Sequence, residues 1–161
     1  MAKSPDVGTT APDFTLPSVT LRDGTAQRAD LTLSQQRGST VVLVFYPGDE
    51  TSVCTKQLCS YTSELGRFTD LGATVWAISP QDLDSHESFA RKERLGFPLL
   101  ADTDRAVVRS YGIGLPGLGL RRSVFVIDAD GILRWKHVAL VGLTYPDAAT
   151  IAGHLPAHSE G

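Results

Sequence analysis

The sequence predicts an α/β fold of three layers with a mixed central sheet. Two buried strands, a helical pattern after each of them and a late hairpin signal are the observations that indicate it. The chain has 161 residues, of which 42% are hydrophobic and 20% are charged, as in ordinary globular proteins. We expect this length to form a single domain over residues 6–157, with flexible termini at 1–5 and 158–161.

The first half of the chain contains a hairpin, a buried strand and a long helix. The first 35 residues, with turns expected at Pro17 and at Asp23-Gly24, are typical of an added N-terminal β-hairpin. Residues 40–46 (TVVLVFY) form a continuous β-branched and aromatic run, which indicates a strand buried on both faces. Residues 51–69 repeat apolar side chains at spacings of three and four, which predicts a helix.

The second half continues the alternation of strands and helices. Residues 73–79 (ATVWAIS) predict a second buried strand, and residues 82–95 predict a charged, solvent-facing helix that Gly96 and Pro98 end. The remaining expected elements are a short strand at 99–101, a helix at 104–111, an irregular apolar loop at 112–120, a hairpin of strands 123–128 and 132–138, and a final helix at 146–155.

Charge and composition argue against several classes of protein. The chain has 18 acidic and 15 basic residues, and it has no basic block that would suggest a nucleic-acid surface. Its opening residues lack the apolar core of a signal peptide, and no apolar run approaches the roughly 20 residues that span a bilayer. We therefore expect a cytoplasmic protein without nucleic-acid or membrane partners. The two cysteines, Cys54 and Cys59, are too few for a disulfide scaffold or a zinc ribbon.

Cys54 falls in the first turn of the predicted helix at 51–69. Thr51 is a good N-cap, so unpaired backbone N–H groups and the positive end of the helix dipole lie near Cys54 and favour its thiolate. Asp49 and Glu50 oppose this effect, so ionisation of Cys54 requires a cation from elsewhere in the chain. The alternative is a small apolar core residue, because Cys54 shares a helical stripe with Leu58.

The spacing of the two cysteines is informative. Residues five apart in an α-helix have Cα atoms about 8.7 Å apart, beyond the limit of about 7 Å for a disulfide. An intact helix and a Cys54–Cys59 disulfide are therefore mutually exclusive. A disulfide that forms after one turn of the helix unwinds is compatible with this spacing. The spacing also differs from C-x-x-C, which disfavours a thioredoxin-type dithiol reductase. Cys59 alone is equally well explained as a core residue.

The cysteine region resembles a known family. Residues 47–54 (PGDETSVC) resemble the P-x-x-x-T-x-x-C signature of peroxiredoxins. Residues 54–59 (CTKQLC) resemble the branch of the bacterioferritin comigratory protein, or peroxiredoxin Q. The likeness covers residues 7–155, although Ser52 stands where many members have proline. Three further segments agree with the family: 8–17 (GTTAPDFTLP), 77–86 (AISPQDLDSH) and 122–128 (RSVFVID).

The resemblance implies a thioredoxin-like fold and roles for individual residues. It makes Cys54 the peroxidatic cysteine and Cys59 the resolving cysteine. It assigns Thr51 and an arginine to binding the peroxide oxygens, and Pro47 to shielding the sulfur. The alternatives are a plain N-cap for Thr51 and a plain strand terminator for Pro47.

Arg121 and Arg122 compete for the arginine role. In the family this arginine lies three residues before the strand phenylalanine, here Phe125, which favours Arg122. Arg122 would also supply the cation that the acidic neighbours of Cys54 require. The alternative is a solvated arginine at a strand edge.

The implied activity is a thiol-dependent peroxidase that reduces hydrogen peroxide and organic hydroperoxides. Cys54 becomes a sulfenic acid, then forms a disulfide with Cys59, and thioredoxin or a similar dithiol reductant recycles it. No metal, haem or flavin cofactor is implied, and we expect a monomer or a weak homodimer.

Two other functions remain as alternatives. A peroxide-sensing redox switch or interaction module would use the same disulfide, and it would oxidise once without catalytic recycling. Metal binding would rest on four histidines, which we expect instead to be solvated surface residues: His86, His137, His154 and His158.

Overall fold

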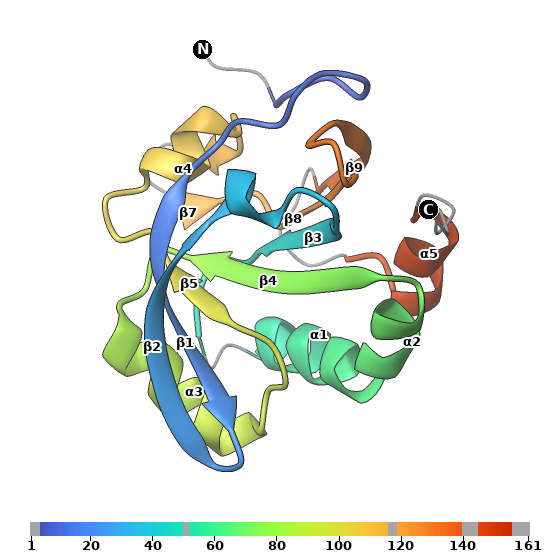
Figure 1. Cartoon of the computed structure of the whole chain (residues 1–161). Helices are drawn as coiled ribbons and strands as arrows, with labels where there is room; N and C mark the ends of the chain where they lie inside the picture. Colours follow the sequence, from blue (N-terminus) through green and yellow to red (C-terminus); the bar gives the residue numbers. More distant parts are fainter. Residues whose placement is uncertain (1–3, 50–51, 116–118, 140–144, 156–161) are drawn as a thin grey trace.

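A seven-stranded mixed sheet forms the centre of the molecule (Figure 1). The computed structural model describes residues 4–49, 52–115, 119–139 and 145–155. The strand order is β2-β1-β5-β4-β3-β8-β9. These strands are β1 (Thr15–Arg22), β2 (Thr25–Thr32), β3 (Thr40–Phe45), β4 (Ala73–Ser79), β5 (Leu99–Ala101), β8 (Ser123–Ile127) and β9 (Leu133–Val138).

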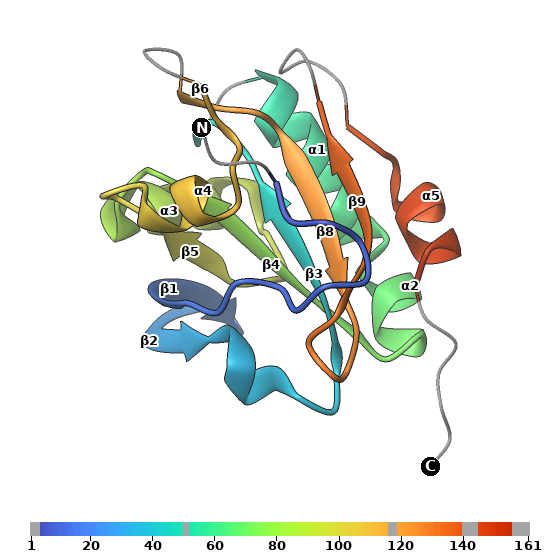
Figure 2. The ribbon, with the colours of Figure 1, turned by 90° about the horizontal axis from the view of Figure 1, so that it is seen from above.

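Helices cover both faces of this sheet, so the three-layer arrangement with a mixed sheet is confirmed. Buried side chains of α1, α2, α3 and α5 pack on one face, and those of α4 and η1 pack on the other. Figure 1 shows α4 above the sheet and α1, α2 and α3 below it, and in Figure 2, seen from above, β8 passes in front of α1. Within the described part of the chain, no helix has the length and apolar character needed to cross a bilayer. The helices are η1 (Leu33–Gln36), α1 (Ser52–Ser63), α2 (Leu65–Asp70), α3 (Leu83–Glu93), α4 (Ala106–Ser110) and α5 (Ala148–Gly153).

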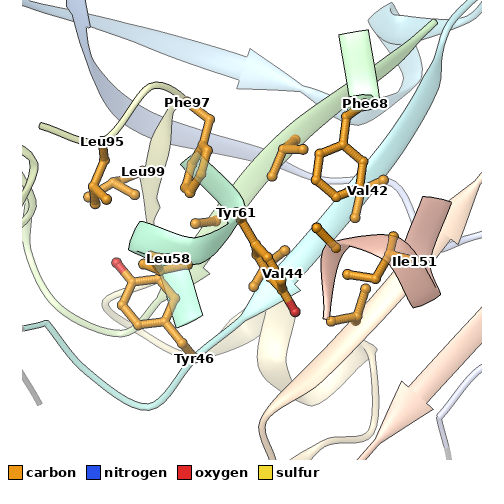
Figure 3. Packing of buried hydrophobic residues seen from close by; sticks show 14 of the residues in the cluster. Val42, Val44, Tyr46, Leu58, Tyr61, Phe68, Leu95, Phe97, Leu99 and Ile151 are labelled. Atoms are coloured by element: carbon orange, nitrogen blue, oxygen red, sulfur yellow. The ribbon is translucent and has the colours of Figure 1, made fainter. Parts of the chain in front are cut away.

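Strand β3 shows why a continuous apolar run predicted a doubly buried strand. It pairs in parallel with β4 and antiparallel with β8, so it lies inside the sheet. Val42 and Val44 point into the core that contains Tyr61 (Figure 3). Leu43 and Phe45 belong to the core on the opposite face. Because side chains alternate along a strand, both faces need apolar residues.

The N-terminal hairpin is confirmed, with one correction. Its turn lies at Asp23-Gly24, where both residues have positive φ. The expected turn at Pro17 is wrong, because Pro17 lies inside β1 and pairs with β2. β5 pairs with β1 at Ser18 and Val19. Pro17 therefore lies just outside that second pairing, at a position where a missing N–H is tolerated.

The helix predicted over residues 51–69 is two helices. α1 ends at Ser63 and α2 begins at Leu65. The Ser63 hydroxyl donates to the carbonyl of Ser60 at 2.8 Å, which competes with the regular helical pattern in the last turn of α1. The apolar spacing continues across this break to the buried Phe68, so the pattern alone does not show it.

The segment at 112–120 is more regular than an irregular loop. β6 (Gly114–Leu115) and β7 (Gly119–Leu120) pair antiparallel as a separate two-stranded sheet. Residues 116–118 between them lie outside the described residues. Backbone pairing, which the glycine-rich composition does not reveal, gives this segment its order.

The prediction that residues 82–95 form a solvent-facing helix is correct for one side of α3 and wrong for the other. Asp82 caps this helix by accepting from the backbone N–H of Ser85 at 2.9 Å. His86, Phe89 and Ala90 are buried. The charged residues of α3 therefore cover the outer side of an amphipathic helix, whose inner side packs on the sheet.

Candidate active site

Cys54 lies near the beginning of α1, directly after the loop that follows β3. α1 begins at Ser52, so Cys54 is its third residue, as predicted. The backbone N–H groups of a first helical turn have no partner within the helix, and they favour a negative charge. The Cys54 side chain has no exposed surface and belongs to the core cluster that includes Leu58. The site is therefore a buried sulfur at a helix N-terminus.

Arg122 provides a cation at this sulfur. Its Nη2 donates to Sγ of Cys54 at 3.1 Å, and its exposed fraction is 2%. Arg122 directly precedes β8, and the first residue of β8, Ser123, pairs with Phe45 at the end of β3. The register of the sheet thus brings Arg122 to the start of α1. Burial excludes the solvated strand-edge alternative, and a guanidinium at this distance favours the thiolate.

Gln57 connects this arginine to the core. Its Oε1 accepts from Nη1 of Arg122, and its Nε2 donates to the Tyr61 hydroxyl at 3.2 Å. The Tyr61 hydroxyl donates to the carbonyl of Pro146 at 2.5 Å. Burial raises the pKa of Tyr61 well above its usual value, so this hydroxyl stays protonated. Sequence reasoning missed Gln57, although its position three residues after Cys54 places both on one helix face.

Asp49, in the loop before α1, lies in a buried polar network. Its Oδ1 accepts from the Tyr46 hydroxyl at 2.7 Å, and its Oδ2 accepts from Ser85 Oγ at 2.7 Å. Nδ1 of His86 lies 2.8 Å from Oδ2, and Nε2 of His86 lies 2.9 Å from the carbonyl oxygen of Leu100. Both ring nitrogens of His86 thus contact oxygen atoms, and Asp49 and His86 form a buried hydrogen-bonded pair.

This network corrects the expectation that His86 is a solvated surface histidine. The side chains of His86 and Asp49 are 0% and 2% exposed. Their contact connects the loop after β3 to α3. Burial, together with the charge and hydrogen bond of Asp49, raises the pKa of Tyr46 well above its usual value. The Tyr46 hydroxyl therefore remains a donor.

Cys59 has different surroundings from Cys54. It is half-buried further along α1, and its Sγ donates to Oε2 of Glu93 at 3.4 Å. Burial raises the pKa of the Cys59 thiol, and the hydrogen bond and charge of Glu93 raise it further. Neither cysteine is in a disulfide, and both lie on the same helix, α1.

Two other candidate residues flank the start of α1. Pro47 is half-buried and follows the end of β3 by two residues. Gly48 lies so close to Gln81 that an added Cβ would be 3.2 Å from its Oε1, which is tighter than an ordinary contact. The N–H of Asp49 donates to the same oxygen. Thr51, the expected N-cap and peroxide ligand, lies outside the described residues.

The other histidines lie away from this site. His154 stacks on Trp135 with ring centroids 4.5 Å apart, and His137 lies on β9 beside the same ring. His158 lies outside the described residues. Among the residues with described positions, no group of three or more His, Cys, Asp or Glu side chains is arranged to bind a metal.

Comparison with known proteins gives one consistent result. The model of the AhpC/TSA family matches residues 7–136. A Coxiella burnetii protein named "Putative peroxiredoxin bcp" is 34% identical over 146 residues, which cover 85% of this chain and 92% of that protein. The chloroplastic peroxiredoxin Q of Populus jackii is 39% identical over 73% of this chain. The match covers 55% of the plant protein, so this chain spans about half of its length.

Solved structures of peroxiredoxins have the same fold. BcpB of Mycobacterium tuberculosis superposes with a TM-score of 0.71 at 31% identity, over 85% of this chain and 88% of that chain. The reduced 2-Cys peroxiredoxin of Plasmodium vivax gives a TM-score of 0.81 at 23% identity, over 91% and 78% of the two chains. The expected thioredoxin-like fold is confirmed by these similarities.

Proposed function

Because the chain belongs to the AhpC/TSA family, we propose that it reduces hydrogen peroxide and organic hydroperoxides with Cys54 as the peroxidatic cysteine. Family membership supports a thiol peroxidase that acts on hydroperoxides and uses a thiol reductant. The observation that carries the assignment of Cys54 is the Arg122 guanidinium 3.1 Å from its sulfur, at the start of a helix. Both features stabilise a thiolate, which is the reactive form of cysteine.

The first step is attack of the Cys54 thiolate on one peroxide oxygen. The S–O bond forms as the O–O bond breaks, and the departing oxygen leaves as water or an alcohol after it takes a proton. Cys54 is oxidised to a sulfenic acid, and the peroxide is reduced. Arg122, the Cys54 backbone N–H and Thr51 bind the two oxygens, and Arg122 stabilises the charge on the departing one.

Access to the sulfur requires a local movement. Cys54 has no exposed surface, so the first turn of α1 or its surroundings must open before a peroxide reaches the sulfur. Pro47, two residues after the end of β3, shields the sulfur from water in the closed state. This shielding favours reaction with a bound peroxide over reaction with other solutes.

The second step joins the two cysteines. The Cys59 sulfur attacks the Cys54 sulfur, the S–O bond breaks, and the oxygen leaves as water. Because both residues lie on α1, the intervening turns must unwind first. Thioredoxin or a similar dithiol protein then reduces the disulfide by exchange. The antioxidant activity of this cycle needs no further cofactor.

Peroxide consumption with thioredoxin, thioredoxin reductase and NADPH tests this proposal. We expect the native protein to turn over many times and Cys54→Ser to be inactive. Cys59→Ser should reduce about one equivalent of peroxide and then stop, because the thiol that resolves the sulfenic acid is missing. Full thioredoxin-coupled turnover by Cys59→Ser would contradict the role of Cys59. A single oxidation of the native protein with excess reductant would favour the sensor alternative.

A further inference from the structure

We propose that Glu93 is a positioning residue for the resolving step: its carboxylate keeps Cys59 a neutral thiol on folded α1 and releases it when α1 unwinds. This inference rests on the proposed function, in which Cys59 resolves the Cys54 sulfenic acid. It starts from one contact between two helices, in which Cys59 Sγ on α1 donates to Glu93 Oε2 on α3 at 3.4 Å.

The two sulfurs of α1 face opposite charges. Cys54 lies 3.1 Å from the Arg122 guanidinium, whereas Cys59 donates to the Glu93 carboxylate. A neighbouring cation favours a thiolate, and a neighbouring anion favours a thiol. This difference directs peroxide to Cys54 and leaves Cys59 unreactive until it is needed.

The causes that raise the pKa of Cys59 support this role of Glu93. Burial raises its pKa, followed by the hydrogen bond and then the negative charge of Glu93. Lys92 and Arg94 flank Glu93 on the chain, and Lys56 lies one helical turn before Cys59. Even so, within the described part of the chain Glu93 is the charged group that raises the pKa of the Cys59 thiol.

The position of Glu93 links this effect to the opening of α1. Glu93 is the last residue of α3, whose Phe89 and Ala90 are buried against the sheet. α3 can therefore stay in place while α1 unwinds, so movement of Cys59 toward Cys54 breaks the contact with Glu93. The released thiol then loses the two influences of Glu93 and ionises more readily, at the moment when it must attack.

α3 thus contacts both ends of the reactive segment. Through His86 and Ser85 it binds Asp49 before Cys54, and through Glu93 it binds Cys59 after Cys54. The first contact fixes the loop that leads into the helix, and the second fixes the thiol five residues beyond the reactive sulfur.

Alkylation of Cys59 tests the proposal independently of peroxidase activity. In a Cys54→Ser background, Cys59 is the sole thiol, and its rate of reaction with iodoacetamide is measured by mass spectrometry from pH 6 to 10. Adding Glu93→Gln should raise the rate at pH 7.5 about three- to tenfold and move the profile to lower pH, since one pKa unit changes the thiolate fraction up to tenfold. Glu93→Asp keeps the charge on a shorter side chain, so its rate of reaction with iodoacetamide should lie between those of the parent protein and of Glu93→Gln.

Glu87→Gln is the matched control on the same helix. Its carboxylate contacts Arg28 and Arg91, so the same chemical change there should leave the Cys59 profile within about twofold of the parent. An unchanged profile for Glu93→Gln, or an equal shift for Glu87→Gln, would overturn the proposal. Glu93→Ala gives the same comparison if the glutamine variant does not fold.

A second readout follows the resolving step with both cysteines present. After one equivalent of peroxide, Glu93→Gln should form the Cys54–Cys59 disulfide several-fold faster than the native protein, with an unchanged rate of sulfenic acid formation. Equal or slower disulfide formation would overturn the proposal. If the native protein consumes no peroxide, the proposed function fails, but the alkylation profiles still test the effect of Glu93 on Cys59.

Discussion

At the scale of single residues, the buried guanidinium of Arg122 determines the chemistry of the site. A charge without exposed surface is unfavourable unless polar partners compensate it. Arg122 has such partners in Gln57 Oε1 and the Cys54 sulfur. The guanidinium is therefore held against the Cys54 sulfur among core residues that exclude water, where it would stabilise a negative charge that develops on the sulfur.

Replacing Arg122 tests this interaction. Arg122→Lys keeps a positive charge but loses the planar group that donates to Cys54 and Gln57 together. We expect the rate constant for oxidation of Cys54 by hydrogen peroxide to fall about 10²-fold or more, as on loss of a transition-state donor. Stopped-flow tryptophan fluorescence measures this rate.

Arg121→Lys is the matched control, because Arg121 is the neighbouring arginine that competed with Arg122 for this role in the sequence. Arg121 is half-buried and next to Arg122 in the chain. Its substitution should change the rate constant by less than about threefold. Equal losses in the two variants would contradict the assignment of Arg122.

The sequence predicted part of this residue-level arrangement. The helical pattern and the expected cap at Thr51 placed Cys54 in the first helical turn, and the family resemblance favoured Arg122 through its spacing to Phe125. Gln57 and Glu93 were not predicted, since an isolated Gln or Glu on a helix has the same sequence appearance whether it faces solvent or a sulfur. Their partners become visible only when β8 and α3 are placed against α1.

At the scale of elements, the loop between β3 and α1 is connected to α3 by a buried hydrogen-bonded pair, Asp49 and His86. His86 and Asp49 have almost no exposed surface, and their remaining polar atoms contact Tyr46, Ser85 and the backbone of Leu100. This loop carries Pro47 and leads into the Cys54 turn. The stability of the loop and the geometry of the reactive sulfur are therefore coupled.

Substitution of His86 should show this coupling. His86→Gln removes the ring nitrogens that contact Asp49 and the carbonyl of Leu100, and we expect it to lower the free energy of unfolding by about 2 kcal/mol. Urea denaturation measures the change. The double variant Asp49→Asn/His86→Gln should regain part of the loss, because the buried carboxyl group that lost its partner is removed as well. Strict additivity of the two single changes would contradict a direct interaction between the two side chains.

The hairpin of β8 and β9 depends on another carboxylate. Asp128 accepts from the N–H groups of Asp130 and Ile132, each at 2.9 Å, and from Nε of Arg134 at 2.5 Å. Burial acts to raise the pKa of Asp128, but the Ile132 N–H, Arg134 and the Asp130 N–H together outweigh it and lower the pKa. The ionised carboxylate thus stabilises the turn that joins β8 to β9.

The lowered pKa gives a pH dependence with a definite sign. Because the folded value lies below the ordinary one of about 3.9, Asp128 stabilises the fold above that pH, and this contribution is lost as pH falls through the folded pKa. We expect Asp128→Asn to cost about 1–2 kcal/mol at pH 7 and clearly less at pH 2–3. A loss of equal size at both pH values, measured by chemical denaturation, would contradict this account.

Sequence patterns predicted element types better than element ends. The strands at 73–79 and 99–101 were predicted with their observed ends, because doubly buried strands have continuous apolar runs. The break at Glu64 and the pairing of β6 with β7 were missed. The break is accompanied by a hydrogen bond from the Ser63 hydroxyl to the backbone, and β6 and β7 are joined by backbone pairing. Neither feature leaves a periodic signal in the apolar side chains.

At the scale of the whole molecule, the sheet separates two apolar cores, and α1 covers only one of them. Leu58 and Tyr61 of α1 are fully buried in that core, together with Cys54. Unwinding the start of α1 therefore removes apolar surface from the core on one face, while the core on the other face is undisturbed. This layered arrangement permits a local change in α1 without loss of the fold.

The central claim is that Cys54 and Cys59 react as a pair after α1 partly unwinds. The direct measurement is a thiol count together with far-UV circular dichroism, before and after one equivalent of hydrogen peroxide. We predict that both thiols disappear together, that helical signal falls by an amount equal to one or two turns, and that a dithiol restores both. Oxidised protein that keeps two free thiols, or that forms the disulfide with an unchanged helical signal, would contradict the account.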